Sequence, residues 1–275
     1  MANAPKPTTA KKESSGSSIF ASLSIVMCIL VGVLLWKFVM GDASNFEGGD
    51  PENGHPLPGN YFGMVYKGGY VVPVLMGLFL MVIVFSFERF FVIGKATGKG
   101  NIDLFVKKVQ SLIGAGNIDS AISECDKQEG SVANVIKSGL KKYKEVETET
   151  KMDTEQKCLA IQKDIEEATA LEMPMLEQNL TVIATLVSIG TLMGLLGTVT
   201  GMIKAFAALS TAGSPDQAAL ANGISEALIN TATGIATSAL AIVMYNIFTS
   251  KIDKLTYAID EAGFSIVQTY ASTHK

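Results

Sequence analysis

The chain has 275 residues, of which 48% are hydrophobic and only 17% charged, and its mean hydropathy is +0.32. Soluble domains usually contain about 25% charged residues, so an ordinary soluble enzyme is disfavoured. The formal net charge of -4 supplies no basic field for phosphate groups, and we expect no nucleic-acid partner. Three cysteines without a CxxC pair and two histidines leave little material for a disulfide framework, a metal site or a catalytic histidine, so we expect no cofactor.

The first apolar block covers residues 19–40 and follows a polar segment, residues 1–18, which we expect to be a disordered cytoplasmic tail. A helix of this length rises about 33 Å, enough to cross a hydrocarbon core of about 30 Å. A cleaved signal peptide is the alternative interpretation, because three lysines precede the block. The block is longer than the apolar region of a signal peptide and no Ala-x-Ala site follows it, which favours a transmembrane helix.

Three further apolar blocks are long enough to span a membrane. The second, within residues 70–93, follows a segment rich in Gly, Pro and Asn, residues 41–69, which is typical of an irregular periplasmic loop. The third and fourth lie within residues 180–250. Because a helix satisfies every backbone polar group in lipid, the sequence predicts an all-α polytopic membrane protein with four transmembrane helices.

Residues 94–179 are charged, and their apolar side chains recur at helical spacing, which predicts a cytoplasmic helical domain with glycines at its helix ends. No nucleotide-binding or nucleophile motif occurs in this domain, so we interpret it as a helical extension without chemistry of its own. The expected core residues are Ile102, Phe105, Val106, Val109, Ile118, Ile122, Val132, Val135, Ile136 and Leu140.

Two helices are expected to be longer than the membrane is thick, and the first of them is expected to extend well into the cytoplasm. From Asp153 the helical pattern runs without a break to about Leu209, with a kink at Pro174. The last helix is expected to begin at Ser214-Pro215-Asp216, a helix-start pattern, and to end near Phe248. Residues 251–275 would then form a cytoplasmic C-terminal tail.

The distribution of positive charge predicts the orientation. With four crossings, the N-terminal tail, residues 88–179 and the C-terminal tail lie on one side and hold three, thirteen and three of the 22 Lys and Arg residues. Cytoplasmic loops carry the excess of Lys and Arg, so both termini and the helical domain are expected in the cytoplasm.

A stripe of glycines on the third block predicts close helix packing. At spacings of four, three and four residues they share one helix face, which permits close approach of another helix. The stripe consists of Gly190, Gly194, Gly197 and Gly201. Thr191 and Thr198 lie beside it, and taken alone Thr198 is interpreted as structural, bonding its own i−4 carbonyl.

A continuous polar face on the fourth block points to a bundle interior or a watery cavity. Glu226 has two interpretations there: it sits exposed at the outer interface, or it lines a polar pore near its mouth, which the continuing polar face favours. The face consists of Asn222, Glu226, Asn230, Thr233 and Thr237, widened by Thr231 and Ser238.

These residues resemble a known family. Residues 194–199 (GLLGTV), residues 226–232 (EALINTA) and Tyr245-Asn246 before a basic segment are similar to ExbB of the ExbB/TolQ/MotA proton-channel family. The close match covers roughly residues 171–250, and as a pair the two longer motifs are specific. The chain departs from the family in its additional N-terminal helix, residues 19–40, which we expect to pack at the periphery.

The resemblance implies a homo-oligomeric ring, a pentamer in the family, around the single transmembrane helix of an ExbD-like partner. Proton flow would drive a TonB-like protein that energises outer-membrane transporters from the bacterial inner membrane. It also implies pore-lining roles for Thr198 and Thr231 and a matching role for Glu226. Thr191, Asn230, Thr233 and Thr237 complete the expected proton path.

The residues themselves add one constraint. The chain offers hydroxyls and amides at mid-membrane depth but no central Asp, Lys or His. A proton relay needs a group that binds and releases protons there, so the missing carboxylate should come from a partner helix. TolQ-like and MotA-like motor subunits, and a passive oligomeric scaffold without a proton role, compete with the ExbB-like interpretation.

Overall fold

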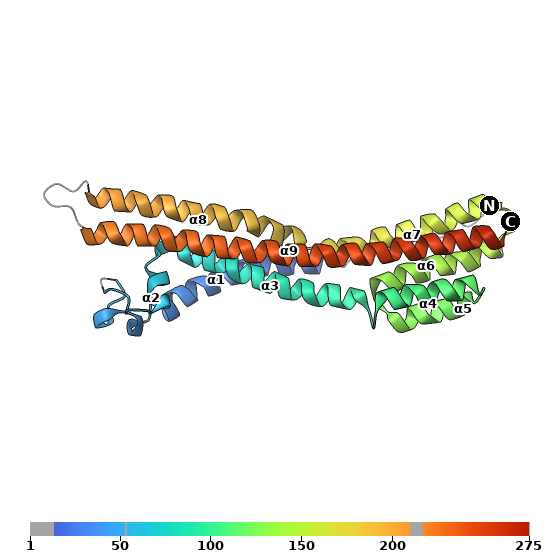
Figure 1. Ribbon diagram of the computed structural model, residues 1–275, viewed down its shortest axis with the longest axis horizontal. Helices are drawn as coiled ribbons and strands as arrows, with labels where there is room; N and C mark the ends of the chain where they lie inside the picture. The colour runs from blue at the N-terminus through green and yellow to red at the C-terminus, as the bar shows by residue number, and fades with distance from the viewer. Residues whose placement is uncertain (1–13, 53, 210–216, 275) are drawn as a thin grey trace. The chain divides into compact units, whose positions relative to one another are not determined.

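The computed structural model describes residues 14–52, 54–209 and 217–274 (Figure 1). Within these ranges the chain is helical, and its only strand-like pairing is an isolated bridge between Phe46 and Pro56. The predicted all-α fold is confirmed for this part of the chain. Its segments that are long and apolar enough to cross a membrane are Ala21–Met40, Gly69–Gly114, Thr154–Leu209 and Gln217–Thr273.

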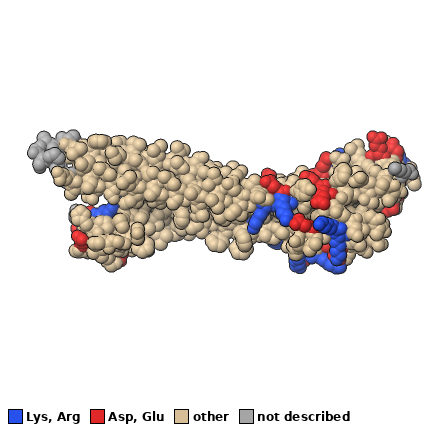
Figure 2. Space-filling view, in the orientation of Figure 1, with Lys and Arg blue, Asp and Glu red and all other residues tan. Residues whose placement is uncertain are grey.

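The chain divides into two compact units: unit 1, residues 1–84 and 186–240, and unit 2, residues 85–185 and 241–275. Three helices contribute residues to both units, namely α3 (Val72–Thr97), α8 (Leu180–Leu209) and α9 (Gln217–Thr273). On the face shown in Figure 2, the charged side chains gather over unit 2 and over the loop around α2 (Tyr61–Tyr66), and the long helices of unit 1 show almost none. Unit 1 therefore has the surface expected of a membrane-spanning body.

The first helix of unit 1, α1 (Ser14–Leu34), continues as a π-helical stretch, Leu35–Met40. It begins within the segment expected to be a tail, and residues 1–13 of that tail lie outside the described part of the chain. α1 packs tightly on α3, because a Cβ on Gly32 would lie 2.7 Å from the backbone nitrogen of Gly77. The additional helix is thus joined to α3 by direct contact of main chains.

The loop after α1 contains more local structure than its composition suggests. Asn45 is buried, and Trp36 stacks on Tyr66 with 4.7 Å between ring centroids. The loop therefore has a small core of its own above α1 and α3. Its short helices are Ala43–Asn45, Glu47–Gly49, α2 (Tyr61–Tyr66) and Gly69–Val71.

Unit 2 contains residues 94–179, the segment in which the sequence predicts a helical domain. Figure 1 shows its four short helices beside the C-terminal part of α9. All the apolar residues predicted for its core are buried except Ile122, which is partly exposed. The helices are α4 (Ile102–Gly114), α5 (Ile118–Gln128), α6 (Gly130–Glu147) and α7 (Thr154–Glu177).

Helix α9 continues well beyond the expected end near Phe248 and stops at Thr273. The C-terminal segment expected to be a tail is a core helix of unit 2, because one apolar face of it is buried at helical spacing. The residues of that face are Ile252, Leu255, Ile259, Ala262, Ile266 and Tyr270. The expected helix start at 214–216 lies outside the described residues.

The prediction of one unbroken helix from Asp153 to Leu209 is wrong. α7 ends at Glu177, where the Gln178 N–H donates to the Pro174 carbonyl, and Asn179 takes a left-handed conformation with φ of 60°. Asn tolerates that conformation better than most residues, and it commonly follows a helix end. A break four residues after Pro174 therefore replaces the predicted kink.

Candidate functional site

Unit 1 brings α8 and α9 side by side, antiparallel, along the glycine stripe (Figure 1). A Cβ on Gly194 would lie 3.1 Å from Gly234 Cα, and one on Gly201 would lie 2.8 Å from the Gly223 carbonyl oxygen. Gly190 faces Ser238 in the same way, and Gly197 faces Asn230. The stripe thus allows the polar face of α9 to meet α8 at backbone distance.

Thr198 and Thr231 meet across this contact with their hydroxyls hydrogen-bonded to each other. Each hydroxyl also lies near the carbonyl four residues earlier, Thr198 Oγ1 at 3.2 Å from Gly194 O and Thr231 Oγ1 at 3.1 Å from Ala227 O. Each hydroxyl has one proton to donate. The two protons can therefore fill only two of these three hydrogen bonds at a time, namely the bond between the hydroxyls and the bonds to the two carbonyls. The pair is half-buried and can exchange donor and acceptor roles by rotation of the hydroxyls.

A second hydroxyl pair lies two turns along the same helix contact. Thr191 Oγ1 is 2.9 Å from Ser238 Oγ, and Thr191 itself is exposed. Thr233 and Thr237 instead donate to carbonyls of their own helix, at 2.8 and 2.9 Å, and Thr237 is fully buried. The hydroxyls shared by α8 and α9 therefore form a line separate from that of Thr233 and Thr237.

Glu226 is buried, with 8% of the residue exposed, which removes the interpretation of a carboxylate exposed at the outer interface. Its Oε1 lies 2.6 Å from Lys204 Nζ on α8. The second neighbour is Gly69, just before α3, which adopts a φ of 76° and whose Cβ, if present, would lie 2.7 Å from Glu226 Cδ. Glu226 thus sits between an ammonium and a main-chain segment that needs glycine.

Asn230, one turn from Glu226, is fully buried and donates from Nδ2 to the Gly68 carbonyl oxygen at 2.9 Å. Its Oδ1 is buried without a hydrogen-bond donor among the described residues. The side chain therefore ties α9 to the segment before α3 and leaves one buried acceptor oxygen.

The structure divides the predicted site residues into two groups. Thr191, Thr198 and Thr231 lie together on the accessible edge between α8 and α9, whereas Asn230 and Thr237 are buried inside the single chain. Their place on a proton path stays a prediction. Asn222, also on the predicted polar face, is exposed and lies beyond the Glu226 turn.

Lys204 is a site residue that the sequence analysis did not include, because its partner lies on another helix. It follows Gly201 by three residues and so continues the glycine stripe toward α9. In the antiparallel register that places Gly194 against Gly234 and Gly201 against Ala227, Lys204 falls opposite position 224, and its long side chain reaches Glu226. That continuation of the stripe was the signal in the sequence.

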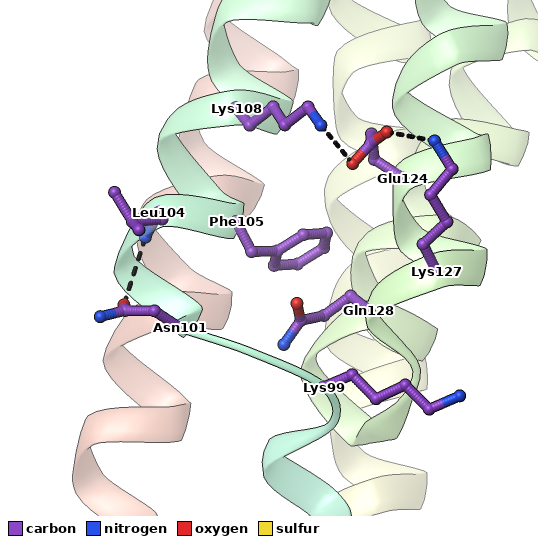
Figure 3. A pocket seen from close by; sticks show the side chains of 8 residues that line it. All are labelled: Lys99, Asn101, Leu104, Phe105, Lys108, Glu124, Lys127 and Gln128. Carbon is purple, nitrogen blue, oxygen red and sulfur yellow. Dashed lines mark hydrogen bonds and ion pairs between the residues drawn. The ribbon is translucent and has the colours of Figure 1, made fainter.

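Unit 2 contains a cleft of about 260 Å³ with three lysines at its rim and Phe105 at its floor (Figure 3). Lys108 and Lys127 both bind Glu124 at 2.7 Å, and Lys99 binds Glu129 at 2.6 Å. The two lysines hold the pKa of the Glu124 carboxyl below its usual range. These charges therefore satisfy one another at the rim of the cleft.

The fold and the site define a polytopic helical membrane protein with a line of hydroxyls between two apolar helices. Residues 127–261 match the MotA/TolQ/ExbB proton channel family. These residues are a domain of that family, whose members work in complexes with partner proteins.

Curated relatives carry the names of two branches of the family. The chain is 26% identical to the Tol-Pal system protein TolQ of Pseudomonas aeruginosa over 70% of this chain and 84% of that protein. It is 30% identical to the putative biopolymer transport protein ExbB-like 3 of Synechocystis over 40% of this chain and 53% of that protein. It is 39% identical to the biopolymer transport protein ExbB of Salmonella typhimurium over 31% of this chain and 35% of that protein.

Proposed function

We propose that the chain is an ExbB-like subunit of an inner-membrane, proton-driven motor that energises TonB-dependent outer-membrane transport. The observation that carries the proposal is the contact of Thr198 and Thr231, two half-buried hydroxyls that join α8 to α9 close to a buried carboxylate. Hydroxyls that exchange donor and acceptor roles pass a proton along without holding a charge. The role is transport, with no catalytic step on the chain and no cofactor.

The kind of partner is inferred from the ionisable residues that the membrane segments of α8 and α9 lack. Residues 186–203 and 227–240 contain Thr, Ser and Asn but no Asp, Glu, Lys, Arg or His. We infer that a partner helix, ExbD-like and single-spanning, supplies a transmembrane Asp beside the hydroxyl pair, as a proton carrier at that depth requires. The chain forms a ring around that helix, a pentamer by family resemblance, with both termini and unit 2 in the cytoplasm.

A TolQ-like role is the second candidate, and one observation favours it. The similarity to the Pseudomonas TolQ extends over 84% of that protein, whereas the similarity to the Salmonella ExbB covers 35% of it. A MotA-like stator and a passive oligomeric scaffold are the third and fourth candidates. The ExbB-like, TolQ-like and MotA-like roles share the hydroxyl pair and the proton path.

The test is pH-driven proton flux in vesicles that contain the chain with its co-expressed partner. We expect flux in the wild type and a strong loss in Thr198→Val or Glu226→Ala complexes that assemble normally. Wild-type complexes without flux would support the passive scaffold. Complementation then separates the motor roles, because an ExbB-like subunit restores TonB-dependent nutrient uptake and a TolQ-like subunit restores resistance to detergents.

A further inference from the structure

The ion pair of Lys204 and Glu226 is the one charged contact between α8 and α9 in the described part of unit 1. Nζ and Oε1 are 2.6 Å apart, and the Lys204 side chain is 52% exposed while that of Glu226 is 11% exposed. The ammonium thus covers a buried carboxylate from the accessible side. The pair lies about two turns from the hydroxyls of Thr198 and Thr231.

The described contacts of the carboxylate include no second cation. The main chain at Gly69 closes one side, and the buried Oδ1 of Asn230, one turn away on α9, has no donor within the described residues. Carboxylate and amide oxygens are the ligands preferred by hard metal cations. Without Lys204, this end of the helix pair would offer a metal cation a buried negative charge.

We propose that Lys204 determines ion specificity: its ammonium occupies the Glu226 carboxylate and so prevents alkali metal cations from binding at the mouth of the proton path. A metal cation has to displace an ammonium of equal charge and lose its own water to bind there. A proton is not excluded in this way, since it moves along hydrogen bonds and needs no vacant coordination site on the carboxylate. This inference rests on the proposed function.

The experiment measures pH-driven proton flux in vesicles that contain the complex with its partner, once in sodium chloride and once in choline chloride. Choline is too large to bind a half-enclosed carboxylate in place of the ammonium. For the wild type we expect the same flux in both salts. For Lys204→Met we expect sodium to lower the flux at least about tenfold, because close charge pairs of this kind are strongly coupled and their loss leaves the carboxylate open.

Three variants isolate the role of the ammonium. Lys204→Gln is a second neutral variant and should respond to sodium as Lys204→Met does. Lys204→Arg keeps a cation beside Glu226 and should give equal flux in both salts. Lys67→Met is the matched control, since Lys67 donates to the carbonyl of Glu52 at 2.8 Å instead, and it should also give equal flux in both salts.

The outcomes separate this inference from the proposed function. If both neutral variants gave the same proton flux in sodium chloride as in choline chloride, the specificity role would be overturned and the proposed function would remain. Loss of flux in both salts, or failure of both neutral variants to assemble, would also overturn it, because Lys204 would then serve conduction or stability itself. A wild-type complex without flux in choline would overturn the proposed function and this inference with it.

Discussion

Gly194 and Gly234 bring the main chains of α8 and α9 into direct contact, since a Cβ on Gly234 would lie 2.7 Å from Gly194 Cα. That distance is shorter than real Cβ contacts, so a side chain at this position must push the helices apart. We expect Gly234→Ala to cost about 1–3 kcal/mol of stability, as overpacking does. Thermal unfolding of the detergent-solubilised protein measures it.

Gly94 provides the control, because a Cβ there meets no atom within 4 Å. Gly94→Ala should be neutral or stabilise α3 by up to about 1 kcal/mol, the difference in helix propensity. Equal losses of melting temperature in both variants would contradict the close contact of α8 and α9.

The hydroxyl of Thr198 should matter more for conduction than for stability. Thr198→Val keeps the shape and removes the contact with Thr231, so we expect proton flux through the complex to fall about a hundredfold or more, within the range that a proton-transfer group contributes. Thr198→Ser should keep most of the flux.

Thr185→Val is the matched control for that experiment. Thr185 lies on the same helix, and its hydroxyl donates to the carbonyl of Thr181 at 2.7 Å. Its substitution should leave the flux unchanged. If Thr185→Val lowered the flux as much as Thr198→Val, the effect would not depend on the contact between Thr198 and Thr231. The proposed proton path would then lose its support.

Arg89 should hold the break between α7 and α8 in place. Its buried guanidinium donates to the carbonyls of Met175 and Leu176, both at 3.1 Å, and pairs with Glu88. These carbonyls belong to the last turn of α7 and have no helical partner. We expect Arg89→Met to destabilise the protein by about 3–5 kcal/mol, as loss of one partner of a buried pair does.

Circular dichroism during thermal unfolding measures the Arg89 effect. Lys251→Met is the control, because Lys251 lies 5.1 Å from the Phe90 ring centroid, a contact worth about 0.5–1 kcal/mol at an exposed site. If Arg89→Met shifted the melting temperature no more than Lys251→Met, Arg89 would have no special role at the break.

The sequence predicted the all-helical fold and the glycine contact well, because both follow from periodicity within one helix. It failed where a boundary depends on another element. The break at Asn179 needs carbonyls capped by Arg89, which is 90 residues away, and the C-terminal part of α9 is helical because unit 2 buries its apolar face.

The same distinction explains which features of the site could be predicted from the sequence. Thr198 and Glu226 stood out as polar residues in apolar helices, which a single sequence shows. The partner of Glu226 did not, since Lys204 reads as a helix-end lysine until the register of α8 on α9 is known. Asn230 looked like part of an open polar face, but its amide binds the Gly68 carbonyl inside the chain.

Asn45 should control the folded loop after α1. It is buried, donates to the carbonyls of Val39 and Met40 at 2.9 and 3.0 Å, and so closes the end of the π-helical stretch. We expect Asn45→Ala to destabilise the loop by about 1–3 kcal/mol, because buried acceptors lose their donor. Trp36, the one tryptophan of the chain, stacks on Tyr66 and reports the change.

The expected signal is a shift of Trp36 emission to longer wavelength as its stacking is lost. Ser44→Ala is the control, because Ser44 bonds only Asp42 and is exposed. An unchanged emission spectrum in Asn45→Ala would mean that the loop keeps its structure without this side chain.

Cys125 should resist alkylation while unit 2 is folded. Burial in the bundle raises the pKa of its thiol from 9.0 to about 12, with the nearby Asp126 carboxylate adding to the shift. At pH 8.5 its thiolate fraction is then roughly a thousandfold lower than in the unfolded chain, and the thiolate is the reactive form. Because the folded pKa is raised, the linked stability is present below pH 9 and is lost as the pH rises toward 12.

Iodoacetamide labelling followed by mass spectrometry tests this prediction for Cys125. The thiol should react at the rate at which unit 2 unfolds. Rapid labelling in the native state at pH 8.5 would show that its surroundings are open to water.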